Sequence, residues 1–178
     1  MSAAVLLMNE HRIIERIIPV LNKGARKMAA GAAVDPVFID RITDFFRSYS
    51  DRCHHGKEED ILFRVLAEKS LSPRHRKDMN ELAEEHVYLR KQIAQLALQK
   101  EAFLHGNKAG VAGAVGVLKG LADFYPNHID KEDNHFFTPA MDYLSRAEQE
   151  EMMRQFAEFD RKLFHEKYSM LIEEMEKA

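Results

Sequence analysis

The sequence predicts an all-α protein, an up-down-up-down four-helix bundle with an additional helix at its C-terminal end. Apolar residues recur at helical spacing along almost the whole chain. The breaks between these periodic segments carry residues that start and stop helices. With 178 residues the chain can bury one core of ordinary size. We therefore expect one domain over residues 1–178, with the core bundle at about 4–144 and the extra helix at about 145–176.

The first two helices are expected at about residues 4–29 and 35–67. The first carries an apolar face at helical spacing, formed by Leu7, Ile14, Ile17, Ile18 and Leu21. The second begins at Asp35 and Pro36, because an aspartate cap followed by a proline at the first helical position is a typical helix start.

The third helix, expected from residue 72 to about 104, repeats this start signal at Ser72 and Pro73. The fourth spans roughly residues 109–144 and is rich in glycine in its first turns. These glycines either let a neighbouring helix approach closely or weaken the turns that contain them. They are Gly110, Gly113, Gly116 and Gly120.

The last helix is expected to begin at Ser145, since Ser145-x-x-Glu148 fits a capping box, and to run to about residue 176. Four long helices and this fifth one then make up the chain. Short connections between long helices favour antiparallel neighbours.

Composition excludes several classes of partner. The formal net charge of −3 provides no basic excess to attract a phosphate backbone or an anionic bilayer, so we expect neither nucleic acid nor membrane as partner. The N-terminal residues lack a basic flank, a long apolar stretch and a cleavage pattern, which favours a cytoplasmic protein. The single cysteine, Cys53, cannot form an internal disulfide or a thiolate cluster. A metal site must therefore use nitrogen and oxygen ligands.

A motif that combines a histidine with a glutamate four residues later occurs twice. Residues 55–63 and 128–136 both fit His-x-x-x-Glu-Asp-x-x-Phe. A Glu-His pair precedes each motif on the preceding helix, ending at His11 and His86. The two motifs start 128 − 55 = 73 residues apart and the two pairs 86 − 11 = 75 apart. These near-equal offsets indicate that one helix-pair unit occurs twice in the chain.

This repeat predicts a metal site inside the bundle. Residues four apart lie on one face of a helix, so each motif brings an imidazole and a carboxylate to the same small volume. A single such pair is commonly a surface contact, and a lone helical histidine is usually a hydrogen-bonded core residue, but matched repeats favour ligation. Imidazole and carboxylate together suit iron, manganese or zinc, with iron favoured. The candidate ligands are His11, His55, Glu59, His86, His128 and Glu132.

With these residues in this order, the sequence resembles the hemerythrin-like, or HHE cation-binding, family of four-helix bundles. The resemblance extends from His11 to about Phe137. It implies two iron ions joined by an oxo or hydroxo bridge, with Glu59 and Glu132 as bridging carboxylates. It also implies reaction with dioxygen, nitric oxide or peroxide.

The chain departs from the oxygen-carrying members of that family at three points. Arg90 stands where their third helix has a second histidine, Glu132 follows His128 by four residues where they have an aspartate after five, and an extra helix follows the fourth. These differences argue against simple oxygen carriage and favour a sensing, repair or regulatory role.

Two further residues are weighed as ligands. Glu15 and Arg90 lie four residues after His11 and His86, so Glu15 either adds a carboxylate to the metal site or pairs with Arg90. His165, on the extra helix, is the candidate for the missing fifth histidine. The alternative for His165 is packing against the outside of the bundle.

Other polar residues near the motifs receive more ordinary roles. We expect His54 at the surface or in contact with a ligand, because it points away from its neighbour His55. Tyr125, about one turn before His128, either hydrogen-bonds a bound oxygen species or packs in the core. Lys57 and Lys131, at similar places in the two motifs, are expected to reach solvent.

Three functions follow from these patterns, and the first is favoured. It is a di-iron protein that binds or senses dioxygen, nitric oxide, related oxidants or cellular iron. The second is a di-iron redox enzyme with peroxidase-like, catalase-like or nitric-oxide-consuming activity. The third is a structural or storage cation site for zinc or iron. The expected partner is a small diatomic gas or a peroxide, and a homodimer stays open.

Overall fold

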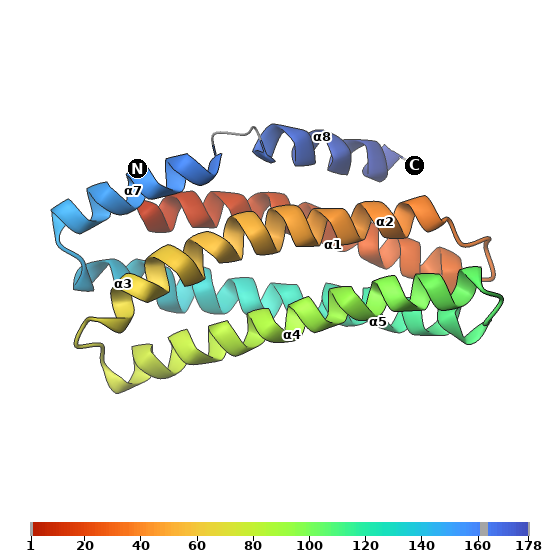
Figure 1. Ribbon diagram of the computed structural model, residues 1–178, viewed down its shortest axis with the longest axis horizontal. Helices are drawn as coiled ribbons and strands as arrows, with labels where there is room; N and C mark the ends of the chain where they lie inside the picture. The colour runs from red at the N-terminus through yellow and green to blue at the C-terminus, as the bar shows by residue number, and fades with distance from the viewer. Residues whose placement is uncertain (1, 161–163, 178) are drawn as a thin grey trace.

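The computed structural model describes residues 2–160 and 164–177, and over this part of the chain the secondary structure is helical without strands. Figure 1 shows long helical rods side by side, each running opposite to the one before it in the sequence. The predicted fold class is confirmed. No helix in the described ranges combines the length and apolar character needed to cross a membrane.

The first rod is helix α1, Ala3–Ala29. It begins where the Ser2 side chain accepts a hydrogen bond from the backbone N–H of Val5. It ends just before Gly31, whose φ of 82° is a backbone conformation that favours glycine.

The second rod has an unusual backbone. It comprises α2 (Pro36–Asp44), η1 (Phe45–His55), η2 (Glu58–Phe63) and α3 (Arg64–Ala67), of which η1 and η2 are π-helical. A π-helix closes its hydrogen bonds over one more residue than an α-helix. Side chains along this rod therefore point in different directions from those that a period of 3.6 residues predicts.

The third rod is α4, Pro73–Leu104. The fourth contains α5 (Ala109–Asp130), the π-helical segment η3 (Lys131–Phe136), α6 (Phe137–Ala140) and the short 3₁₀ segment η4 (Met141–Tyr143). The rods pack so that α5 lies between α1 and α4.

The glycines of α5 differ from one another in their surroundings. A Cβ atom on Gly110 would lie 2.6 Å from the backbone oxygen of Gln99 and 2.8 Å from the backbone nitrogen of Phe103. Gly116 and Gly120 have open space at that position. Close helix approach therefore explains Gly110, and the other two glycines serve no packing purpose that the structure shows.

The C-terminal segment expected as one helix contains two, α7 (Arg146–Asp160) and α8 (Phe164–Lys177), on either side of residues outside the described part. Figure 1 shows both along the outside of the bundle, where they pack against α1 and the second rod. The capping box that opens α7 is confirmed, since the backbone N–H of Ser145 donates to Glu148 at 2.9 Å and the N–H of Glu148 donates to Ser145 Oγ at 3.3 Å.

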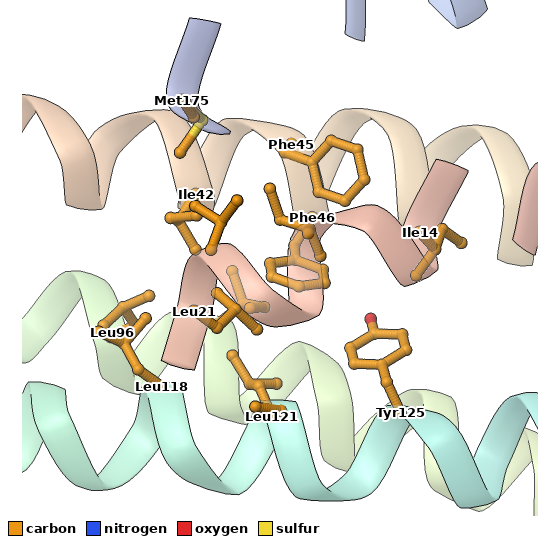
Figure 2. Packing of buried hydrophobic residues seen from close by; sticks show 14 of the residues in the cluster. Ile14, Leu21, Ile42, Phe45, Phe46, Leu96, Leu118, Leu121, Tyr125 and Met175 are labelled. Carbon is orange, nitrogen blue, oxygen red and sulfur yellow. The ribbon is translucent and has the colours of Figure 1, made fainter. Parts of the chain in front are cut away.

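The apolar interior forms two clusters, one toward each end of the bundle. Figure 2 shows the larger one, where Leu21, Phe46 and Leu121 meet from three different rods. The smaller cluster is built by residues that include Leu7, Phe63, Leu82, Phe136 and Phe156.

A polar layer separates the two apolar clusters. On α1, His11 lies between Leu7 of the smaller cluster and Ile14 of the larger one, at the spacing of a core position. On α4, His86 lies in the same way between Leu82 and Leu89. The histidines therefore occupy positions that the helical pattern assigns to the core.

Candidate metal centre

Seven buried histidine and glutamate side chains meet in the polar layer, and each is at most 2% exposed. All four rods contribute to this set, which we call the centre. Its members are His11, His54, His55, Glu58, His86, His128 and Glu132.

The centre divides into two groups that could each hold a metal ion. One group contains His55, His86 and His128, and the other contains the remaining two histidines and both glutamates. Within each group the candidate ligand atoms lie within 4.8 Å of one another. We call them the three-histidine group and the two-histidine group.

The two carboxylates lie between the groups. Glu132 Oε2 is 3.1 Å from His11 Nε2 and 3.4 Å from His128 Nε2. Glu58 Oε1 is 3.3 Å from His54 Nε2, and its Oε2 is 3.3 Å from His86 Nε2. Each carboxylate therefore reaches both groups, which is the arrangement of a carboxylate that bridges two cations.

Several polar atoms of the centre have no hydrogen-bond partner within the part of the chain that the structure describes. They are Nε2 of His55, His86 and His128 and both carboxylate oxygens of Glu58 and Glu132. Buried polar atoms without partners are rare and costly. Nε2 of His11 and Nε2 of His54 also point at each other across 2.8 Å. Cations would satisfy all of these atoms, so the residues present fit metal ions.

The two central carboxylates differ in their electrostatic surroundings. Burial and the neighbouring Glu132 raise the pKa of Glu58 well above its ordinary value. Burial acts in the same direction on Glu132, but His128, His11 and His86 outweigh it and lower the pKa of Glu132 well below its ordinary value. Two carboxylates this close repel each other unless positive charge lies between them.

The histidines also differ from one another. Burial and the adjacent imidazoles lower the pKa of His55 well below its ordinary value, and burial with His11 nearby lowers that of His54 to about 4. Both rings are therefore neutral near pH 7, as a metal ligand must be. Burial would also lower the pKa of His11, but hydrogen bonds to Asp133 and Glu132 outweigh it and raise the pKa to about 9.

A layer of carboxylates surrounds the centre and orients its imidazoles. Each of the five rings turns Nδ1 outward to an acidic side chain and Nε2 inward. Such a partner fixes the tautomer and orientation of a metal-binding histidine. The Nδ1 pairs are His11–Asp133 at 2.6 Å, His54–Glu10, His86–Glu59 and His128–Glu85 at 2.7 Å each, and His55–Asp51 at 3.4 Å.

Cationic side chains in turn hold all five of these outer carboxylates. The pairs are Lys57–Glu10, Lys131–Glu85, Arg12–Asp133, Arg90–Glu59 and Arg90–Asp51. Lys57 is fully buried, and its Nζ lies 5.9 Å from the ring centroid of Phe156 on α7. The expectation that Lys57 reaches solvent is therefore wrong.

The layers show where the internal repeat is in register. Three residues of the second rod match residues of the fourth rod at a single offset of 74 positions. The matched pairs are His54 with His128, Lys57 with Lys131, and Glu58 with Glu132. Glu59 corresponds in the same way to Asp133. The repeat thus starts at His54, one residue before the position that the sequence pattern selects, and His55 corresponds to Ile129.

This register corrects the expected pair in the second rod. The structure brings five of the six expected ligands together, all but Glu59. Glu59 is 28% exposed and bonds His86 Nδ1 and Arg90, while Glu58 faces the centre. The π-helical backbone of η1 and η2 lets the adjacent His54 and His55 both reach the interior. The sequence does contain a signal for His54. An offset of 74 residues matches His54 to His128 and also matches Lys57 to Lys131.

Of the two weaker candidates, the structure describes the side chain of Glu15 only, and that side chain lies away from the centre. Glu15 is 38% exposed and pairs with Arg12 at 3.1 Å, whereas Arg90 pairs with Asp51 and Glu59. Glu15 and Arg90 do not meet because α1 and α4 each pack against α5 and not closely against each other. His165 lies in α8, but its side chain falls outside the described residues.

A four-helix bundle with inward-facing histidines and glutamates defines a class, the helical-bundle metal-binding proteins. The family model described as the hemerythrin HHE cation binding domain matches residues 2–140. The chain belongs to this family of cation-binding domains, and the resemblance seen in the sequence is confirmed. No curated protein and no solved structure matches the chain.

Proposed function

We propose that the centre holds two iron ions and that the protein binds or senses a small oxidant, either dioxygen, nitric oxide or a peroxide. The observation that carries this proposal is the donor set. The centre consists of five imidazoles and two carboxylates that both groups share. The one cysteine, Cys53, belongs to neither group. Nitrogen and carboxylate donors without thiolate suit non-haem iron.

The positions of the side chains indicate which of them would hold each ion and which would orient the imidazoles. The three-histidine group would hold one ion, His11 and His54 would hold the other, and Glu58 and Glu132 would offer carboxylate oxygens to both. The iron pair, when bound, supplies the redox and ligand-binding chemistry. The outer carboxylates keep each Nε2 directed inward, and the two apolar clusters keep bulk water away from the centre.

The unequal number of histidines supports ligand binding over a closed structural site. A structural zinc site is normally filled by four protein ligands, whereas a reactive site keeps a position open. His11 and His54 supply two nitrogens where the other group supplies three. The ion in the two-histidine group would therefore have fewer protein donors and room for another ligand.

Elemental analysis with an optical spectrum tests the proposal. Protein purified under air should contain two irons per chain and absorb in the near-ultraviolet and visible range. The protein is then reduced under anaerobic conditions, and its spectrum should change when dioxygen or nitric oxide is added. A colourless protein with one zinc per chain would overturn the proposal. Sustained turnover of peroxide by the loaded protein would instead favour the redox-enzyme alternative.

A further inference from the structure

Helix α7 reaches the outer layer of the centre. Figure 1 shows α7 along the outside of the bundle, and its Phe156 is 0% exposed. The Phe156 ring centroid lies 5.9 Å from Nζ of Lys57, close enough for the ring to attract the ammonium group. Lys57 pairs with Glu10, whose Oε2 is 2.7 Å from Nδ1 of His54. A continuous chain of contacts therefore joins α7 to a histidine of the two-histidine group.

The equivalent chain in the other half of the repeat ends at solvent. There Lys131 pairs with Glu85, which in turn bonds Nδ1 of His128. Lys131 is 28% exposed, whereas Lys57 is 0% exposed. The two halves share the order of lysine, carboxylate and imidazole, and they differ in what covers the lysine. Burial next to α7 distinguishes the chain that begins at Lys57.

Helix α7 lies beyond the domain that the family shares. The family model ends at residue 140, whereas α7 spans Arg146–Asp160. The seven members of the centre come from the four rods. The contact between α7 and Lys57 is therefore an addition to the cation-binding domain, made by a segment that supplies none of those seven members.

Helix α7 packs less extensively against the bundle than α5 packs against α1 or α4. Met152 and Phe156 are buried on its inner face and belong to the smaller apolar cluster. Beside Met152, a cleft of about 280 Å³ separates α7 from Ile61 and Val65 of the second rod. Segments with fewer buried contacts open at a lower free energy than the core. The docking of α7 can therefore respond to changes in the layer beneath it.

A cation in the two-histidine group would act on this chain from its inner end. By binding Nε2 of His54 it would fix the ring, so that Nδ1 stays directed at Glu10 and Glu10 stays beside Lys57. Loss of the cation lets the ring and the carboxylate move, which weakens a buried ion pair. Because a buried charge is costly unless it is well paired, water is then drawn to Lys57. Phe156 lies beside that ammonium, so its hydration requires α7 to separate from the bundle.

We propose that α7 reports whether the two-histidine group holds a cation. An occupied group keeps α7 docked on the bundle, and loss of the cation releases α7 and uncovers Lys57. This inference rests on the proposed function, because it adds a route by which the state of the metal centre changes the outer surface of the protein. By linkage, docking of α7 must in turn strengthen cation binding by the same factor.

Amide hydrogen exchange on the full chain measures the docking of α7, and zinc is the probe cation. Zinc has no redox chemistry, so its effect reports occupancy alone. Adding two equivalents of zinc to metal-free protein should slow exchange in residues 146–160 by about fivefold or more, the usual size of coupling between two sites. The measurement is repeated with ferrous iron under anaerobic conditions.

Three variants test the path of the coupling. Phe156→Leu keeps an apolar side chain but removes the ring beside Lys57, so zinc should change exchange in residues 146–160 by less than about twofold. Competition with a chelator should show that the same variant binds one of its two zinc ions more weakly, by about fivefold or more. The matched controls are Met152→Leu, on the same buried face of α7, and Lys131→Met, at the counterpart of Lys57. Both should respond to zinc as wild type does.

The outcomes separate this inference from the proposed function. If wild-type protein binds two irons but neither metal changes exchange in residues 146–160, α7 is not coupled and the iron centre stands. An equal response in Phe156→Leu and wild type would also overturn the inference. If zinc slows exchange in wild type but not in Phe156→Leu, and purified protein holds no iron, the coupling to a cation stands and the iron proposal fails. A chain that binds neither metal would overturn both.

Discussion

The Glu59 carboxylate accepts a hydrogen bond from Nδ1 of His86 at 2.7 Å, across the interface between the second and third rods. Glu59 is thus an outer partner of the centre, and its neighbour Glu58 is the buried carboxylate that faces the imidazole Nε2 atoms of the centre. Two adjacent glutamates therefore have different roles, which substitution can separate.

Glu58→Ala should reduce the metal content below two ions per chain, because it removes a carboxylate that both groups share. Glu59→Gln should keep two ions per chain and weaken metal affinity by roughly 10–100-fold, the usual effect of removing an outer partner of a ligand. Elemental analysis and competition with a chelator measure these two quantities. Full metal content in Glu58→Ala together with loss in Glu59→Gln would show that the structural assignment is reversed.

Lys57 and Lys131 occupy equivalent places in the repeat but differ in burial. Lys57 and Glu10 are 0% and 2% exposed, whereas Lys131 and Glu85 are 28% and 22% exposed. Lys57→Met removes the ammonium group from a buried carboxylate and should lower the free energy of unfolding by about 3–5 kcal/mol. Lys131→Met should cost below about 1 kcal/mol, because water reaches its partner.

Denaturant unfolding at a fixed metal content measures both lysine variants. Adding Glu10→Gln to Lys57→Met should recover part of the loss, since the remaining buried charge is then removed. Equal destabilisation by the two lysine substitutions would contradict the role that we assign to burial.

Gly110 and Gly116 provide a matched pair on one helix. Gly110→Ala places a methyl group against the backbone of α4 and should lower the free energy of unfolding by about 1–3 kcal/mol. Gly116→Ala meets no atom within 4 Å and should raise it by about 0.5–1 kcal/mol through helix propensity. Thermal or denaturant unfolding tests the opposite signs, and a loss at Gly116 equal to that at Gly110 would refute the packing argument.

Glu148 should make the start of α7 sensitive to acid. Hydrogen bonds from Lys69 and Ser145 lower the pKa of Glu148 to about 2. A carboxyl group whose pKa is lower in the folded state stabilises the fold above its unfolded value near 4.5 and loses that effect as the pH falls toward 2. The difference in unfolding free energy between wild type and Glu148→Gln should therefore shrink between pH 5 and pH 2. A difference independent of pH would exclude ionisation of Glu148 as its cause.

Helical periodicity and capping residues predict the rods well because both are local properties of the chain. Asp35 with Pro36 and Ser145 with Glu148 begin helices as their patterns indicate. The location of the centre also follows from the sequence, since His11 and His86 stand at core positions on regular α-helices.

Which side chains of the second rod face the interior is not predicted by helical periodicity, because the backbone of this rod departs from 3.6 residues per turn. A pattern search that assumes α-helix pairs His55 with Glu59, although the π-helical turns bring His54 and Glu58 inward. The partners of Glu15 and Arg90 could not be predicted either, because they depend on which rods become neighbours.

The repeat described above also explains how the molecule can be asymmetric. A single two-helix hairpin that paired with its own copy would already contribute four histidines and two glutamates, but every substitution in it would appear twice. Joining both hairpins in one polypeptide allows a change on one side alone. His55 opposite Ile129, and Arg90 opposite Glu15, are differences that no symmetric pair of identical hairpins could hold.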